Sequence, residues 1–189
     1  MALGDSITAA FSARSSVDEN RGLSWAIGGD EGALTLPNVL RAVSPQESIF
    51  GASTGKHMLE FPHKKYHKND ICNGAQSAAW AMDLPYQVDH IVETLKSAPN
   101  VNFDEDWKLM TVLIGANDVC YSCWDKYYQT KSNPDYYEKW VRTTLEQVHS
   151  KIPRVFVNLV LMFNISQVHY VAKGNLHCEF AQQVIGDWL

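Results

Sequence analysis

The apolar residues of this chain fall into two kinds of pattern. Continuous apolar runs at Trp107–Ile114 and Val155–Phe163 have the length and β-branched content of buried strands. Apolar residues at helical spacing predict helices at Thr35–Val43, in the second half of Ser77–Ala98 and at Tyr136–Lys151. Strands that are apolar throughout and alternate with helices predict a parallel sheet that is covered on both faces.

Weaker patterns complete the expected architecture. Ser48–Ser53 and Ile71–Ala75 are interpreted as two further strands, and residues 12–34, rich in serine, glycine and charge, predict a long loop. The length of 189 residues suits one domain, and no apolar run is long enough to span a membrane. The predicted fold class is therefore α/β, a three-layer α/β/α sandwich around a parallel sheet.

Composition narrows the classes of function. Hydrophobic residues make up 46% of the chain, which argues against disorder. The net charge is −5 and the basic residues form no long block, so nucleic acid is not expected as the main partner. Four cysteines are too few to fix the redox compartment by number alone.

Two polar motifs follow predicted strands. The tripeptide Gly-Asp-Ser at residues 4–6 predicts a strand end, a sharp turn and a helix start, where helix N–H groups favour developing negative charge. The tetrapeptide Gly-Ala-Asn-Asp at residues 115–118 offers the Asn117 carboxamide, a neutral donor able to hold an oxyanion. Because the carboxyl ends of parallel strands share one edge of the sheet, we expect Ser6 and Asn117 to meet there. Together the motifs predict a serine esterase.

Four ordered blocks, at residues 4–6, 21–30, 73–85 and 106–118, resemble the GDSL (SGNH) hydrolases, and within them the phospholipase B branch of animals. The resemblance extends from residue 2 to about residue 165. It implies the flavodoxin-like fold of that family, with Ser6 as the nucleophile. It also implies an oxyanion hole made by the N–H groups of Ser6 and Ala78 and by the Asn117 carboxamide, with no metal or organic cofactor.

One position of the implied oxyanion hole departs from the family. Ala78 stands where the family usually has a glycine. Alanine keeps the N–H group but disfavours a positive φ, so the geometry is in order only at an ordinary φ. A register slipped by one block would place Gly74 there instead.

The general base is the larger departure. The family uses a histidine in an Asp-x-x-His block, and no histidine here has an aspartate three residues before it: His57, His63, His67, His90, His149, His169 and His177. We therefore expect the base beyond Leu189. The chain is interpreted as a single SGNH hydrolase domain, residues 1–189, that lacks the start of its first strand and the Asp-x-x-His block. Such a fragment is expected to be weakly active or inactive, and poorly soluble.

By resemblance, the predicted reaction is hydrolysis of the acyl esters of phospholipids or lysophospholipids. Substrate would bring the protein into contact with a membrane surface, at an extracellular site or on the luminal or outer side of a membrane. The alternative is a truncated isoform or pseudoenzyme that binds lipid or a protein partner without turnover, as the missing base and Ala78 would allow.

Some smaller features carry their own expectations. His63 and His67 have a spacing that binds metals on helices, but Lys64 and Lys65 between them favour a solvated surface, so no metal site is expected. Trp25, Trp107 and Trp140 are expected in the core.

The cysteines and a sequon depend on the resemblance for their meaning. Cys120 and Cys123 form a lone C-x-x-C, which does not suit zinc, and the resemblance implies a small disulfide between them. Cys178 is expected to pair with a residue that this chain does not contain. Asn164 opens an Asn-Ile-Ser sequon, a candidate glycosylation site if the protein is secreted.

Overall fold

The structure is a computed structural model that describes residues 1–14, 16–44, 48–122, 126–164, 167 and 174. Its strands are β1 (Ala2–Gly4), β2 (Lys108–Leu113) and β3 (Val155–Leu159). They form a parallel sheet in the order β1-β2-β3, in which Leu3 lies opposite Val112 and Met110 lies opposite Val157. This confirms the predicted parallel α/β arrangement.

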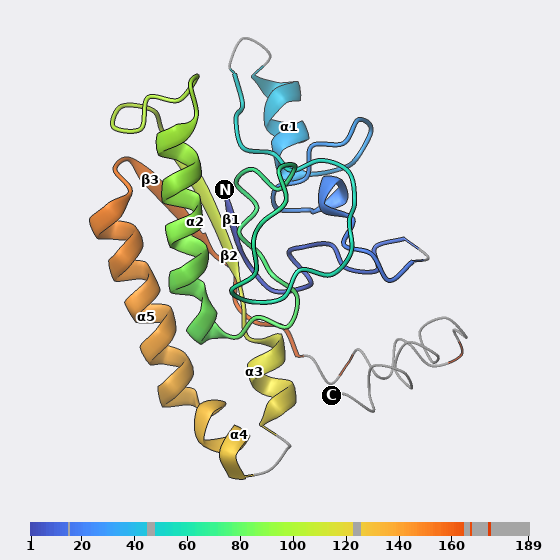
Figure 1. Ribbon diagram of the computed structural model, residues 1–189, viewed down its shortest axis with the longest axis vertical. Coiled ribbons are helices and arrows are strands. Elements are labelled where there is room, and N and C mark those ends of the chain that lie inside the picture. The colour runs from blue at the N-terminus through green and yellow to red at the C-terminus, as the bar shows by residue number, and fades with distance from the viewer. Residues whose placement is uncertain (15, 45–47, 123–125, 165–166, 168–173, 175–189) are drawn as a thin grey trace.

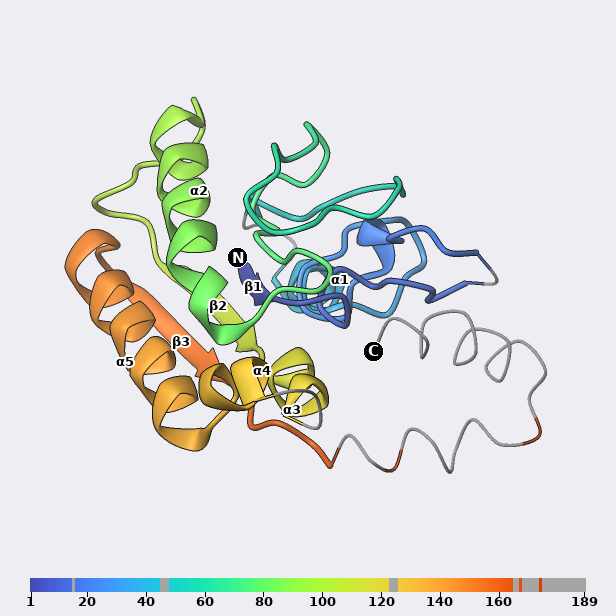
Figure 2. The same ribbon diagram turned by 60° about the horizontal axis from the view of Figure 1, so that its bottom comes forward.

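The pair of helices α2 (Leu84–Ser97) and α5 (Pro134–Lys151) lies on one side of β1, and most of the irregular segments lie on the other side (Figures 1 and 2). The other helices are α1 (Leu36–Val43), α3 (Ala116–Tyr121) and α4 (Lys126–Lys131), with 3₁₀ turns η1 (Arg21–Leu23) and η2 (Ala81–Asp83). The helices α2 and α5 contact each other on one side. The other side holds α1 and a set of irregular segments, residues 5–14, 16–35 and 48–80, which we call the loop layer.

The apolar core lies between the sheet and the pair α2 and α5. Alternate residues of β2, Met110 and Val112, point into it and meet the buried face of α2. Ala2 points the other way and packs with Ala26 and Ile27 of the loop layer. The remaining buried apolar residues of the core are Leu3, Cys72, Ala79, Ala81, Leu84, Val88, Ile91, Leu95, Ile114, Val148 and Ile152.

The predicted helices are confirmed at α1, α2 and α5. Thr35 caps α1, its hydroxyl accepting the Asn38 N–H, and Asn133 caps α5 by accepting the Tyr136 N–H. A proline in the first turn of each helix suits the fixed φ of that residue. None of the helices in the described part is long and apolar enough to cross a bilayer.

Two predicted strands are absent from the loop layer. Residues 48–53 contribute one isolated bridge, from Gly28 to Ser53, and residues 71–75 contribute one, from Ala2 to Asn73. Residues 72–76 do run along β1, but on their other side the carbonyl groups of Asn73 and Ala75 accept hydrogen bonds from the Arg21 side chain. A guanidinium group therefore occupies the position where a further strand would pair.

The expected helix after Ser6 is also absent. Residues 6–10 form successive turns, closed by hydrogen bonds from the Ala9 N–H to the Asp5 carbonyl and from the Phe11 N–H to the Ser6 carbonyl. Ala10 has a φ of +57°, which no right-handed helix can contain. The turn ends there.

The tryptophans differ from expectation in part. Trp140 packs against the core as expected. Trp107 is 77% exposed because it precedes the first residue of β2 and lies beyond the amino ends of the strands. Trp25 is 39% exposed. The strand β3 ends at Leu159 and is therefore shorter than the apolar run, residues 155–163, that predicted it. Leu161, beyond its end, is exposed.

Candidate active site

Ser6 lies half-buried at the carboxyl end of β1. The turn that holds it depends on Asp5, whose Oδ1 accepts the Ile7 N–H at 2.9 Å. Gly4 must lack a side chain, because a Cβ there would collide with the Leu113 carbonyl oxygen of β2. The Gly-Asp-Ser motif is therefore fitted closely to the neighbouring strand.

Gln87 of α2 fixes the residue before this turn. Its Oε1 accepts the Gly4 N–H at 2.8 Å, and its Nε2 donates to the Gly4 carbonyl oxygen at 2.8 Å. One buried carboxamide thus satisfies both backbone groups of the last residue in β1, as a paired strand would.

Asn117 lies in the first turn of α3, directly after the carboxyl end of β2. Gly115 precedes this helix with a φ of +123°, a backbone conformation that glycine adopts readily. The Asn117 Nδ2 donates to the Ala79 carbonyl oxygen at 2.8 Å. A carboxamide carries two N–H groups, so this bond orients Asn117 and leaves its second N–H for a ligand.

Ala78 adopts the conformation that a glycine would favour. Its φ is +64°, in the left-handed region, so the expected ordinary φ is not found and alanine instead adopts the glycine-like backbone at a cost in strain. Ala78 lies half-buried beside Ala79, the residue to which Asn117 bonds. The two predicted donor segments are therefore neighbours.

Two buried carboxyl groups join the same three segments. Asp118 accepts the Ala81 N–H at 3.1 Å, and Asp5 lies near enough to the Ala116 N–H for that group to lower its pKa. Burial is the dominant effect and raises the pKa of each carboxyl to about 6, with mutual repulsion adding to the shift of Asp118. The turn at Ser6, residues 78–81 and residues 115–118 thus meet at one edge of the sheet.

No described histidine hydrogen-bonds to Ser6. His63 pairs with Asp83 at 3.0 Å, and His90 bonds to the Ile71 carbonyl oxygen at 3.2 Å. His57 and His67 bond to carboxylates of the loop layer, and His149 is exposed on α5. His169 and His177 lie outside the described residues, and a base beyond Leu189 stays a prediction.

The sequence patterns did not predict the buried charged residues Arg21 and Glu19, which are linked to Ala78 through the preceding residue. Arg21 is 0% exposed, and its guanidinium group contacts Glu19 Oε2 at 2.8 Å. Ser77, which precedes Ala78, donates its hydroxyl to Glu19 Oε1 at 2.5 Å and its N–H to the Glu60 carbonyl oxygen at 2.8 Å. The only sequence signal was the block at residues 21–30, which carried the family resemblance but no periodicity.

The remaining predicted sites are only partly described. Cys120 is half-buried, but Cys123 and Cys178 lie outside the described residues, so the disulfide stays a prediction. Asn164 is exposed, as glycosylation would require, although the serine of its sequon is also outside them. A cavity of about 550 Å³ lies at the opposite edge of the sheet from Ser6, where Met1, Trp107 and Lys108 help to line it.

Comparison with known proteins agrees with the motifs. Residues 1–183 match the sequence model of the family described as GDSL-like Lipase/Acylhydrolase. Proteins named "Phospholipase B1, membrane-associated" are 39% identical in Rattus norvegicus, over 96% of this chain and 12% of the relative, and 36% identical in Homo sapiens, over 87% and 11%. The chain therefore spans only about an eighth of the length of these relatives. No solved structure gave a significant match. On the family match and these identities together, the chain belongs to the GDSL-like lipase/acylhydrolase family.

Proposed function

We propose that this chain carries the nucleophile and oxyanion donors of a serine ester hydrolase, acting on acyl esters of phospholipids or lysophospholipids. The proposal is supported by the 2.8 Å hydrogen bond from the Asn117 carboxamide to the Ala79 carbonyl oxygen, which joins the segments of Asn117 and Ala78 at the end of the sheet where β1 leads into Ser6. Serine, backbone N–H and carboxamide are the groups that acyl transfer requires.

In the proposed reaction, Ser6 Oγ attacks the acyl carbonyl carbon while its proton passes to a base. The carbonyl oxygen becomes an oxyanion, which accepts from the N–H groups of Ser6 and Ala78 and from the second N–H of Asn117. Collapse of this intermediate breaks the bond to the leaving alcohol, which takes the proton. Water then attacks the acyl-serine ester and releases the fatty acid.

The left-handed conformation of Ala78 supports its place in this scheme. Strained backbone conformations persist where the surrounding structure holds them, and they cluster at active sites. Here the holding structure is the Glu19 carboxylate, which accepts the hydroxyl of the preceding residue, Ser77. Ala78 thus keeps a glycine-like backbone at a cost in stability.

Lipid as the substrate rests on the relatives. These relatives are named as phospholipases and as membrane-associated. We therefore propose that the substrate is met at a membrane surface. The proposed groups contact only the ester carbonyl of the substrate. They therefore do not select among lipid head groups.

The test is labelling of the full-length protein with a fluorophosphonate probe, followed by hydrolysis of lysophospholipid. Ser6→Ala should abolish the adduct and lower kcat by about a million-fold, as in a well-studied serine protease. Asn117→Ala should keep the adduct site and lower kcat by about 100- to 1000-fold. Ser150→Ala, an exposed serine on α5, is the matched control and should leave both readouts unchanged.

A folded full-length protein with no adduct on Ser6 would overturn the proposal. It would leave the non-catalytic alternative, a protein that binds lipid or a protein partner through the same edge of the sheet.

A further inference from the structure

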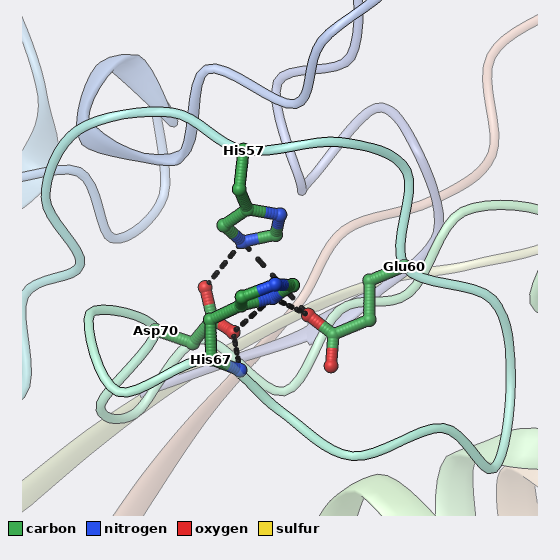
Figure 3. A group of neighbouring side chains, drawn as sticks. All are labelled: His57, Glu60, His67 and Asp70. Carbon is green, nitrogen blue, oxygen red and sulfur yellow. Dashed lines mark hydrogen bonds and ion pairs between the residues drawn. The ribbon is translucent and has the colours of Figure 1, made fainter.

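Two histidines and two carboxylates, none of them a residue of the proposed active site, converge in the loop layer. His57, Glu60, His67 and Asp70 each direct one ligand atom into a group whose members all lie within 4.8 Å of one another (Figure 3). We call these four residues the His/carboxylate cluster. Residues 57–70 contain no helix or strand, so the cluster is built by turns.

The spacing of the ligand atoms suits a tetrahedral ion. His57 Nε2 lies 2.9 Å from Asp70 Oδ1, and His67 Nδ1 lies 3.3 Å from Glu60 Oε2. His57 Nε2 to Glu60 Oε2 and His67 Nδ1 to Asp70 Oδ2 are both 3.9 Å. Zinc binds nitrogen and oxygen ligands at about 2.0–2.2 Å, which places tetrahedral ligands about 3.4 Å apart. Two of the four distances lie below that value and two above it, and they involve both oxygens of Asp70, so a tetrahedral arrangement needs only small side-chain adjustments.

The hydrogen bonds of His57 point independently to a cation. Its Nδ1 lies 2.7 Å from the Met58 carbonyl oxygen, which can only accept, so Nδ1 carries the proton. In a neutral ring Nε2 then presents a lone pair to the Asp70 carboxylate, 2.9 Å away. Two acceptors at that distance repel, so either a second ring proton or a metal ion supplies the positive charge between them.

Buried charge gives a second independent indication. Glu19, Glu60 and Asp70 are each at most 2% exposed, and the Arg21 guanidinium contacts all three. With all three carboxylates ionised, one guanidinium leaves two negative charges, which a divalent cation would balance; without such a cation, burial raises the pKa of Glu60 to about 8 and keeps a proton on it. Glu60 Oε1 is buried and has no hydrogen-bond partner in the described part of the chain. Glu60 therefore has one carboxylate oxygen, beside the Oε2 that faces the histidines, which no described protein group satisfies.

From these observations we propose that the His/carboxylate cluster binds one divalent transition-metal ion, with zinc as its best-suited occupant. Two imidazoles favour zinc and its neighbours over magnesium and calcium, which prefer all-oxygen sites. The i, i+4 pair that the sequence suggested, His63 and His67, is not the site, because His63 bonds to Asp83 instead.

Arg21 and His67 decide how the ion would be accommodated. The Arg21 contacts to Glu60 and Asp70 are 3.4 and 3.3 Å, longer than its 2.8 Å contact to Glu19, so the two ligand oxygens are the less tightly held. The rings of His57 and His67 are stacked, with centroids 3.8 Å apart. An ion shared by both rings requires His67 to turn, and its side chain is 52% exposed and free to do so.

Such an ion would hold residues 57–70 in place next to the segment that carries Ala78, a proposed oxyanion donor. Glu60 accepts the Ser77 N–H through its carbonyl oxygen, and Ser77 precedes Ala78. The inferred role is structural, and it does not depend on Ser6 being a nucleophile.

The experiment uses the purified full-length protein, stripped with a chelator and titrated with zinc and with cobalt. We expect one site that belongs to this cluster, intense visible cobalt bands typical of tetrahedral coordination, and a higher Tm with zinc. Histidine ring resonances of His57 and His67 should move as their stacking breaks. Loss of an outer-shell partner costs about 10- to 100-fold in affinity, so His67→Ala should cost at least about 100-fold.

His149→Ala is the matched control, an exposed histidine on α5, and it should retain the site. His67→Gln is a second test if the alanine variant folds poorly, and it should also lose the cobalt bands. The proposal is overturned if the unsubstituted protein takes up no zinc at this cluster, or if both His67 variants bind zinc as tightly as the control. In either case the cluster is an ion network held by protons alone.

Discussion

The two sides of β1 are held together by different forces. On the side of α2 and α5 the contacts are apolar, and Met110, Val112 and Ile91 are at most 1% exposed. In the loop layer the largest fully buried side chain is Arg21, surrounded by carboxylates and backbone carbonyl groups. One side is therefore stabilised by apolar burial and the other by satisfied charges.

The difference matters because the two forces respond differently to a single change. An apolar core loses stability in proportion to the atoms removed and the cavity left. A buried ion network loses more when one partner is removed, because the remaining charges stay buried without compensation. Ser6, Ala78 and Asn117 lie where the two kinds of packing meet.

Substitution of Arg21 tests the comparison with the largest expected effect. Arg21→Met should lower the free energy of unfolding by about 3–5 kcal/mol, because it leaves Glu19, Glu60 and Asp70 buried without their cation. Chemical denaturation measures the change. Arg142→Met is the control, since Arg142 pairs with Glu138 on the exposed surface of α5, and its stability should barely change. Equal effects of the two variants would contradict the comparison.

The pH dependence of stability tests the region where the apolar core and the loop layer meet. The folded protein raises the pKa of Asp118 from 3.8 to about 6, so ionisation of this group opposes folding. Stability should fall as pH rises from about 4 to about 6, by up to about 3 kcal/mol for this carboxyl. Asp118→Asn keeps an oxygen for the Ala81 N–H and should remove that part of the fall.

The matched control for this titration is Asp104→Asn, an exposed carboxylate in the loop before β2. It should leave the slope unchanged in denaturation curves between pH 4 and 6.5. If Asp118→Asn has the same slope as the parental protein, Asp118 is better solvated than its burial indicates.

The smallest expected effect concerns the conformation of Ala78. A left-handed alanine costs about 1–2 kcal/mol, and glycine costs about 0.5–1 kcal/mol in backbone entropy, so Ala78→Gly should stabilise the fold by about 0.5–1 kcal/mol. Ala79→Gly is the control, because Ala79 has no positive φ and a fully buried methyl group, and it should destabilise. Denaturant midpoints distinguish the two, and destabilisation by both would mean that Ala78 is not strained.

The same contrast explains which parts of the fold could be predicted. The helix α5 could be predicted because its apolar spacing repeats within the helix, although the structure begins it at Pro134, two residues earlier than predicted. Contacts within the loop layer join distant residues, such as Arg21 and the carbonyl group of Asn73, 52 positions apart. No local pattern encodes such a pairing, so residues 71–75 were interpreted as a strand.

The site shows the same division. The placement of Ser6 and Asn117 at one edge follows from the rule that parallel strands end together, together with the motifs themselves. The role of Ala78 came from resemblance alone, and its positive φ could not be deduced from composition or spacing. The His/carboxylate cluster was missed because the spacing of His63 and His67 was tested only against a helix, whereas these residues lie in turns.

The paired hydrogen bonds between Gln87 and Gly4 have a mechanical consequence. They hold the end of β1 against α2 through both backbone groups of one residue, two positions before Ser6. Any displacement of that helix must carry the serine hydroxyl with it or break two bonds at once. The position of Ser6, the proposed nucleophile, is thus coupled to a helix of fourteen residues, and a shift of that helix is expected to move it.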